Sequence, residues 1–292
     1  FVALLPYMEQ KTVYDNFVAY DQSNPGMSLL STLSTTPEPP WRVLLPTMLC
    51  PSDANHEPIH PSWKTGATSY VVSSGDIPFN SSVISGSTYA PNGVGIGRGP
   101  FQSCRFRSLA AITDGTSNTV MFSERLSGFS NGISRRVIDT YVTMGWPVSA
   151  GVSDDPTANG PRPLDPVICF NFVGTGGNYL PKEGFPAGSA VATNNTCGRH
   201  WAYGMANYTS FSTIYPPNAP ACTSRYHWVG GPTSNHAGGA NVCFSDGSVR
   251  FVSDMVHTGD LSLPPVRSGE SPYGVWGACG SAAGCETSMS GL

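Results

Sequence analysis

Two residues near the C-terminal end, His236 and Asp246, have the types and spacing that could support chemistry. A histidine can act as a general base, an aspartate can orient it, and Ser117, Ser245 and Ser248 supply hydroxyl groups for such a pair to activate. None of these three serines lies in a G-x-S-x-G turn that would hold it toward a substrate. A histidine that caps a loop and an aspartate that holds a turn explain the same pattern. We therefore interpret both residues as structural and expect no catalytic residue.

The residues around Asp246-Gly247 predict a β-hairpin. Apolar residues alternate with small or polar ones on both sides, at positions 242, 244, 249 and 251. Asp-Gly between such runs is a strong hairpin signal, because glycine reaches positive φ without steric cost. His236 stands where a glycine-containing loop enters the first strand. We expect a hydrogen bond from its side chain to fix that point.

A second Asp-Gly pair, Asp114-Gly115, places oxygen ligands at alternate positions, as calcium loops do. Asn118 and Glu124 could add ligands, but Arg125 stands where a full EF-hand loop would carry its last glutamate. An Asp-Gly turn with an Asx hydrogen bond is the simpler interpretation. Calcium remains a weak alternative here, and residues 154–155 (Asp-Asp) form a weaker one.

Eight cysteines in a chain rich in glycine and proline favour disulfides and a secreted protein. The 105 pairings of eight cysteines leave most connectivity open. Cys197–Cys222 is the favoured pair because it brackets one long loop, and Cys279–Cys285 would close a short one. Cys243, inside the predicted hairpin, is expected to be a free buried thiol. No C-x2-C pair suggests structural zinc.

Composition limits the class of protein. Charged residues make up 12% of the 292 residues, with 33 Gly and 26 Pro, about half the usual charged share. The net charge of −4 and the lack of a basic cluster argue against nucleic acid as a partner. A surface with few charges suits packing against other protein subunits.

The pattern along the chain predicts a mainly β (α+β) fold with few short helices and long ordered loops. One helix is expected at 6–17, with Pro6 in its first turn. Strands are expected at 68–73, 119–123 and 137–145, before the hairpin. We treat residues 1–292 as one domain, and 153–166 is the best internal boundary.

Aromatic residues offer a second functional class. Six tryptophans, at 41, 63, 146, 201, 228 and 276, could line a groove for sugars. Most are expected in the core, with one or two exposed. A secreted or surface binding module for glycans or envelope polymers is therefore the alternative function.

The order of short sequence blocks resembles a known family. Besides the spacing of His236 from Asp246-Gly247, six blocks carry the resemblance: residues 4–10 (LLPYMEQ), 46–53 (PTMLCPSD, with Cys50), 112–119 (ITDGTSNT, followed by Glu124), 201–204 (WAYG), 211–218 (FSTIYPPN) and 274–277 (GVWG). Together they resemble the bacterial pseudopilin-like family with the H-x9-D-G motif associated with prepilin-type processing. The blocks extend over nearly the whole chain and keep the family's order.

The resemblance implies a location and a mode of assembly. It implies a pilin-like antiparallel sheet domain outside the cell or at the surface of a bacterium, in a type IV pilus or a type II secretion pseudopilus. Its partners would be copies of itself or other pilin-like subunits. Calcium is the metal that some related pseudopilins use. The function expected on this basis is that of a structural subunit without enzymatic activity.

The chain departs from that family at its start. Pilins begin with a long apolar helix that carries a glutamate, whereas here Leu5 takes that place and Pro6 follows. No apolar run approaches the ~20 residues that span a bilayer. We expect the anchor helix to have been removed or to lie upstream of Phe1, so that any membrane contact goes through it.

Overall fold

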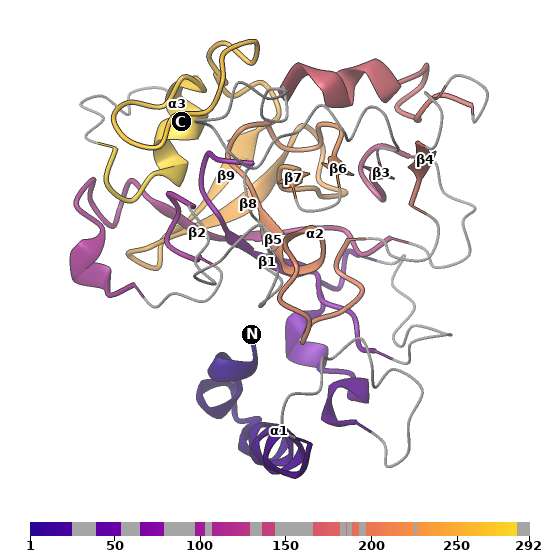
Figure 1. Ribbon diagram of the computed structural model, residues 1–292, viewed down its shortest axis with the longest axis vertical. Helices are drawn as coiled ribbons and strands as arrows, with labels where there is room; N and C mark the ends of the chain where they lie inside the picture. The colour runs from indigo at the N-terminus through magenta and orange to yellow at the C-terminus, as the bar shows by residue number, and fades with distance from the viewer. Residues whose placement is uncertain are drawn as a thin grey trace.

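The fold is built on two β-sheets. A computed structural model of the chain describes residues 1–24, 39–53, 65–78, 97–102, 107–128, 136–143, 166–181, 185, 189–192, 197–224 and 227–284. The larger sheet has the order β5 (Ser210–Phe211), β1 (Tyr70–Ser73), β2 (Val120–Glu124), β8 (Gly239–Phe244) and β9 (Val249–Ser253). The smaller has the order β4 (Ala190–Val191), β3 (Val142–Thr143), β6 (Cys222–Ser224) and β7 (His227–Val229). The mainly β prediction is confirmed (Figure 1).

Both sheets are mixed, so the expectation of an antiparallel sheet is wrong in one respect. β1 pairs in parallel with β5, and β3 pairs in parallel with β6. Parallel neighbours need a long crossover connection, and in both pairs the partner strand comes much later in the chain. Local alternation of residues cannot reveal such pairs.

Among the described residues, helices are few and short, as the sequence predicts. They are α1 (Lys11–Ser23), α2 (Ala206–Thr209) and α3 (Gly274–Gly280), with 3-10 helices η1 (Val2–Met8), η2 (Pro40–Arg42), η3 (Pro46–Met48), η4 (Leu109–Ala111) and η6 (Pro166–Phe172). The helix expected at 6–17 begins later. Pro6 lies inside η1, and Glu9 takes a left-handed conformation with φ 59° before α1 starts at Lys11. Among the described residues, no helix is long and apolar enough to cross a membrane.

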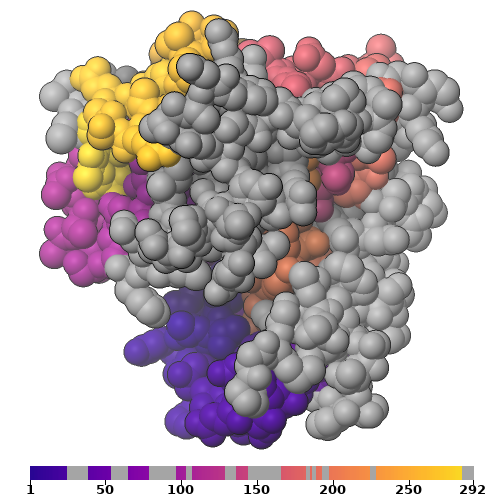
Figure 2. Space-filling model, viewed as in Figure 1, coloured from indigo at the N-terminus to yellow at the C-terminus, as the bar shows by residue number. Residues whose placement is uncertain are grey.

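Separate apolar clusters cover the sheets. α3 packs its Trp276 and Cys279 against the larger sheet, on the buried residues Val242, Phe244 and Val252. The N-terminal segment packs instead on a cluster of Leu5, Leu45, Met48 and Trp201. α1 and α3 consequently lie near opposite ends of the long axis, as Figures 1 and 2 show.

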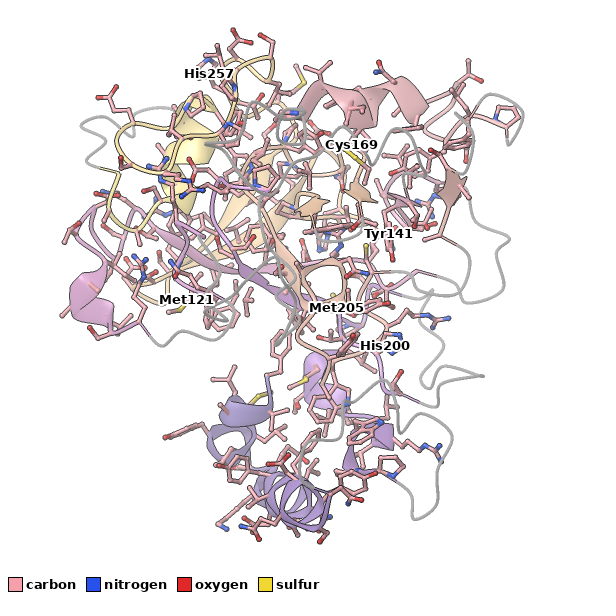
Figure 3. The ribbon with its side chains drawn as sticks, viewed as in Figure 1. Met121, Tyr141, Cys169, His200, Met205 and His257 are labelled. Atoms are coloured by element: carbon pink, nitrogen blue, oxygen red, sulfur yellow. A yellow bond between two sulfur atoms is a disulfide. The ribbon has the colours of Figure 1, made fainter. Side chains whose placement is uncertain are left out.

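A buried arginine joins the two sheets. Arg125 directly follows β2, and its guanidinium lies 4.8 Å from the ring centre of Trp228 in β7. Its Nη1 donates to the carbonyl of Gly231 at 2.9 Å. Tyr141, which also packs edge-on against Trp228, lies between Cys169 and His200 in Figure 3. The cation is held by a carbonyl and an aromatic face, both of which favour a positive charge.

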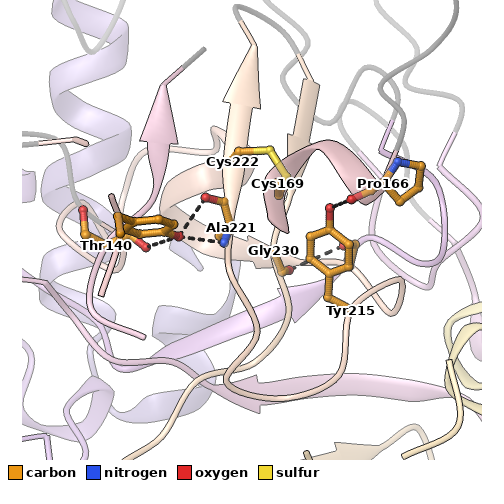
Figure 4. Close-up of a disulfide and its surroundings, with 9 residues drawn as sticks. Thr140, Pro166, Cys169, Tyr215, Ala221, Cys222 and Gly230 are labelled. Carbon is orange, nitrogen blue, oxygen red and sulfur yellow. Dashed lines mark hydrogen bonds between the residues drawn. A yellow bond between two sulfur atoms is a disulfide. The ribbon is translucent and has the colours of Figure 1, made fainter. Parts of the chain in front are cut away.

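The disulfide in the described residues joins Cys169 of η6 to Cys222 of β6, 53 residues apart. The favoured pairing of Cys222 with Cys197 is therefore wrong. Beside the bridge, the Tyr179 hydroxyl accepts from the Ala221 N–H at 2.9 Å and donates to the Ala221 carbonyl at 3.0 Å (Figure 4). The true partner of Cys222 comes from a segment with no periodic pattern, which gave no signal in the sequence.

Three other described cysteines are thiols. Cys50 and Cys197 are free, against the expectation of disulfides. Cys243 is also a free thiol, as predicted, but it is half-buried rather than buried. Burial raises the pKa of Cys197, although Arg125 opposes this. Cys279 is buried in the core beneath α3, and its expected partner Cys285 lies outside the described residues.

One core cluster contains residues from both sides of the expected internal boundary at 153–166. Val137 and Val142 precede residues 153–166, while Cys169, Phe172 and Cys222 follow them, and all five are packed together. The boundary itself lies outside the described residues except for Pro166.

We predict that loss of the Cys169–Cys222 bridge destabilises the fold. Closing a loop of this length contributes about 4 kcal/mol in the chain-entropy model. Cys222→Ala should lower the melting temperature by several degrees, measured by calorimetry without reductant. Cys50→Ser, at an unbridged cysteine, serves as the control. An equal effect of both substitutions would show that the bridge does not stabilise the chain.

Candidate functional site

The predicted hairpin is present as β8 and β9, joined at residues 245–247. The Phe244 N–H donates to the Ser248 carbonyl at 2.8 Å, and the Gly247 N–H donates to the Phe244 carbonyl at 2.9 Å. Gly247 has φ 86°. A β-carbon there would meet no atom within 4 Å, so backbone conformation alone favours glycine. The three-residue loop ending in a left-handed glycine is a common hairpin connection.

Asp246 holds this turn from the solvent side. Its carboxylate accepts a hydrogen bond from the Ser248 N–H at 2.9 Å. That bond is the main reason why the pKa of Asp246 lies below its ordinary value, since it favours the charged form. The aspartate thus acts on the backbone of its own turn, as expected for a structural residue.

The two Asp-Gly turns lie against each other. The N–H groups of Asp246 and Ser245 donate to the carbonyls of Thr116 and Thr119, at 3.0 and 2.8 Å. On the other side, the Asp114 carboxylate accepts from the Gly284 N–H at 2.5 Å. Residues 114–119, which include Gly115 with φ 96°, therefore fix the hairpin turn to the segment after α3.

His236 contacts a carboxylate at the opposite end of β8 from Asp246. Its Nε2 lies 3.4 Å from Oε2 of Glu124, with 41% of the histidine side chain exposed and 9% of the glutamate. Six residues of strand place His236 roughly 20 Å from Asp246. The two residues are therefore too far apart to act together as a catalytic pair. The structural role of His236 stays a prediction, and the contact with Glu124 is the interaction that could provide it.

Glu124 has a role that we did not predict from the sequence: it bonds the backbone of β8. Its second oxygen, Oε1, accepts from the Asn241 N–H at 2.6 Å, and Ser123 Oγ donates to the Asn241 carbonyl at 2.9 Å. Side chains of β2 thus bond the backbone of Asn241, just beyond Ser123 and Val242, the last paired residues at this end of the β2–β8 ladder. Only the position of Glu124 after the second Asp-Gly block could have indicated this role.

The block at residues 46–53 lies close to Glu124 and His236. Asp53 Oδ2 accepts from the hydroxyl of Ser69 at 2.8 Å and from both the N–H and the hydroxyl of Ser127 at 2.9 Å. Asn235 Nδ2 donates to the carbonyl of Ser52 at 3.0 Å. The block is thereby tied to the residue before β1, to the segment that follows β2 and to the residue before His236.

We call this set of contacts the motif junction, made of Cys50–Asp53, Glu124, Asn235–His236 and Asn241. Three sequence blocks that are far apart in the chain meet here. Tyr70 lies opposite Glu124 in the β1–β2 pair, and its pKa is raised by burial first and then by Cys50 and Glu124. Cys50 Sγ lies 3.0 Å from Ser52 Oγ. The polar groups of the junction bind chain segments to one another.

The calcium candidates do not form one site. Asp114 and Asn118 lie at the turn before β2, where Asn118 Nδ2 donates to the Asp114 carbonyl at 3.1 Å. Glu124 lies at the far end of that strand, in the motif junction. Across the described segments, no three His, Cys, Asp or Glu residues could together hold a metal ion. Residues 154–155 are outside those segments.

The comparison with protein-family models gives one match. A family described as "Protein of unknown function (DUF1559)" matches residues 1–259. The match contains five of the six blocks and the whole His236–Gly247 motif, and it ends before residues 274–277. No curated protein and no solved structure matches the chain.

We predict that Gly247→Val destabilises the chain by about 1 kcal/mol or more, because a β-branched residue disfavours positive φ. Gly247→Asn should cost less, since asparagine tolerates the left-handed region. Chemical denaturation of the two variants measures the difference. Equal stability of both variants and the parent would mean that the turn conformation carries no cost.

We predict that Glu124→Ala destabilises by roughly 1–3 kcal/mol, because it leaves the Asn241 N–H without its acceptor. Glu124→Gln keeps an oxygen at that place and removes only the charge that faces His236. It should resemble His236→Ala, with a loss below about 1 kcal/mol for a partly exposed pair. Urea denaturation of the three variants separates the two contacts. A Glu124→Gln variant as unstable as Glu124→Ala would contradict this division.

Proposed function

Because the chain belongs to the DUF1559 family of proteins of unknown function, we propose from its own geometry that it is a structural subunit of a bacterial surface filament or of a pseudopilus-like secretion apparatus. In this role its β-rich domain is displayed outside the cell. The subunit assembles with copies of itself or with other pilin-like subunits and performs no chemical turnover.

The observation that carries the proposal is the use made of the motif residues. Asp246 binds its own turn, Glu124 bridges His236 to the backbone of β8, and Asp53 ties three segments together. A catalytic group must have a reacting atom that faces substrate. In these residues the polar atoms instead bond backbone groups and neighbouring side chains. Such contacts stabilise the fold, as expected in a structural subunit.

The arrangement of the chain supports the same proposal. The N-terminal segment lies at one end of the long axis and α3 lies toward the other, with β8 and β9 between them (Figure 1). We propose that an apolar helix encoded upstream of Phe1 makes the membrane contact from that end. The low charge of the chain is compatible with subunit packing, because interface centres are depleted of charged residues.

The four described tryptophans do not support the alternative function, a binding module for glycans or envelope polymers. Trp41, Trp201, Trp228 and Trp276 are all buried, so none of them offers a face for a sugar ring. Trp63 and Trp146 lie outside the described residues. We therefore rank the structural role first.

We predict that antibodies against this domain label filaments in negative-stain micrographs of native cells. The matched control is a strain whose gene lacks the sequence encoded upstream of Phe1, in which filaments should disappear while the domain remains folded. Labelled protein that is soluble in the medium in both strains would contradict the proposal and favour a free binding module.

A further inference from the structure

β9 is an edge strand whose outer side has hydrogen-bonding groups to offer. Among the described strands it pairs only with β8. The bond from the Phe244 N–H to the Ser248 carbonyl fixes which pairs of the hairpin are hydrogen-bonded. Because these pairs alternate along an antiparallel ladder, Arg250 and Val252 direct their backbone groups to β8. Val249 and Phe251 direct theirs outward, where no partner lies among the described residues.

The same two residues expose apolar side chains. Val249 is 65% exposed and Phe251 is 52% exposed, and Met255, just beyond the strand, is 86% exposed. Phe251 lies against the backbone of Gly239, since a β-carbon at Gly239 would come within 2.9 Å of its ring. The ring is thus supported by β8 and remains open on its outer side. An edge with exposed apolar residues and no proline is suited to strand pairing.

We propose that a second copy of this chain pairs with β9, strand against strand in the antiparallel direction, and forms a two-fold dimer. The register that uses all five residues of β9 places Phe251 opposite Phe251 of the second copy. Val249 then lies opposite Ser253. In this register the outward groups of each strand meet those of the other, so the edge is complementary to itself.

Charge complementarity favours a second copy as the occupant. Arg250, the one charged residue in the strand, comes opposite Val252 of the second copy and diagonal to Asp254. Diagonal neighbours lie within reach of a long side chain. Asp254 makes no side-chain hydrogen bond or ion pair with another described residue. Arg250 is exposed; its Nη2 donates to the Ser117 carbonyl at 3.0 Å and its guanidinium lies over the Phe244 ring, while its other N–H groups have no acceptor among the described residues. Each copy would therefore contribute one cation and one anion, and the pairs form twice across the axis.

This dimer does not depend on the filament. A two-fold contact closes on itself, whereas a filament needs a contact that repeats. The β9 pairing would hold equally in a free secreted domain, and the chain without any upstream segment is the right material to test it.

The test is analytical ultracentrifugation of the chain from low to high micromolar concentration. An interface formed by one short strand from each copy is small and is expected to be weak. The parent should form dimers at the upper end. Phe251→Lys places two like charges at the axis and should weaken the dimer at least about tenfold. Leu263→Lys, at an exposed apolar site outside β9 (45% exposed, against 52% for Phe251), should leave the dimer unchanged. A parent that stays monomeric, or a dimer that survives Phe251→Lys, overturns the proposal.

Engineered cysteines test the register. Phe251→Cys should give a covalent dimer on mild oxidation, since Cα atoms of directly paired residues are about 5.5 Å apart, within disulfide range. Val249→Cys keeps the same background thiols but would face Ser253 of the second copy, so it should not cross-link above the parent. Cross-linking through Val249→Cys and not through Phe251→Cys overturns the proposed pairing.

Discussion

The larger sheet depends on how the backbone of Asn241 is satisfied. Just beyond the last pair of β2 with β8, Ser123 with Val242, the Asn241 N–H and carbonyl are bonded by the side chains of Glu124 and Ser123. A buried backbone group without a partner would cost about as much as the hydrogen bond it lacks. The glutamate therefore keeps β8 in the sheet, and its other oxygen holds His236 at the point where the chain enters the hairpin.

Polar contacts to backbone groups also link distant segments in other parts of the molecule. Arg125 continues from Glu124 into the contact with Trp228 and the Gly231 carbonyl, so one end of β2 connects both sheets. At the other end of β2, the two Asp-Gly turns are bonded through backbone groups. A chain with 12% charged residues is thus held by short polar contacts to backbone, together with separate apolar clusters.

This arrangement explains why we propose no catalytic role for the histidine and the aspartate of the motif. His236 and Asp246 are separated by the length of β8, and each is occupied at its own end of the strand. The motif groups are bonded to other parts of the chain. The outer edge of β9 remains as a surface with exposed apolar side chains and with backbone groups that have no partner among the described residues. A domain of this kind interacts through its edges and faces, which agrees with a role as a subunit.

The sequence by itself determined the local features. The hairpin at Asp246-Gly247, the strand before Glu124 and the small number of helices follow from alternation and turn chemistry within a few residues. The tertiary structure decided the rest: the parallel pairs of β1 with β5 and β3 with β6, the partner of Cys222, the start of α1 and the role of Glu124. These features join residues far apart in the chain, and such contacts are fixed by packing and by the need to satisfy buried polar groups, which no local pattern encodes.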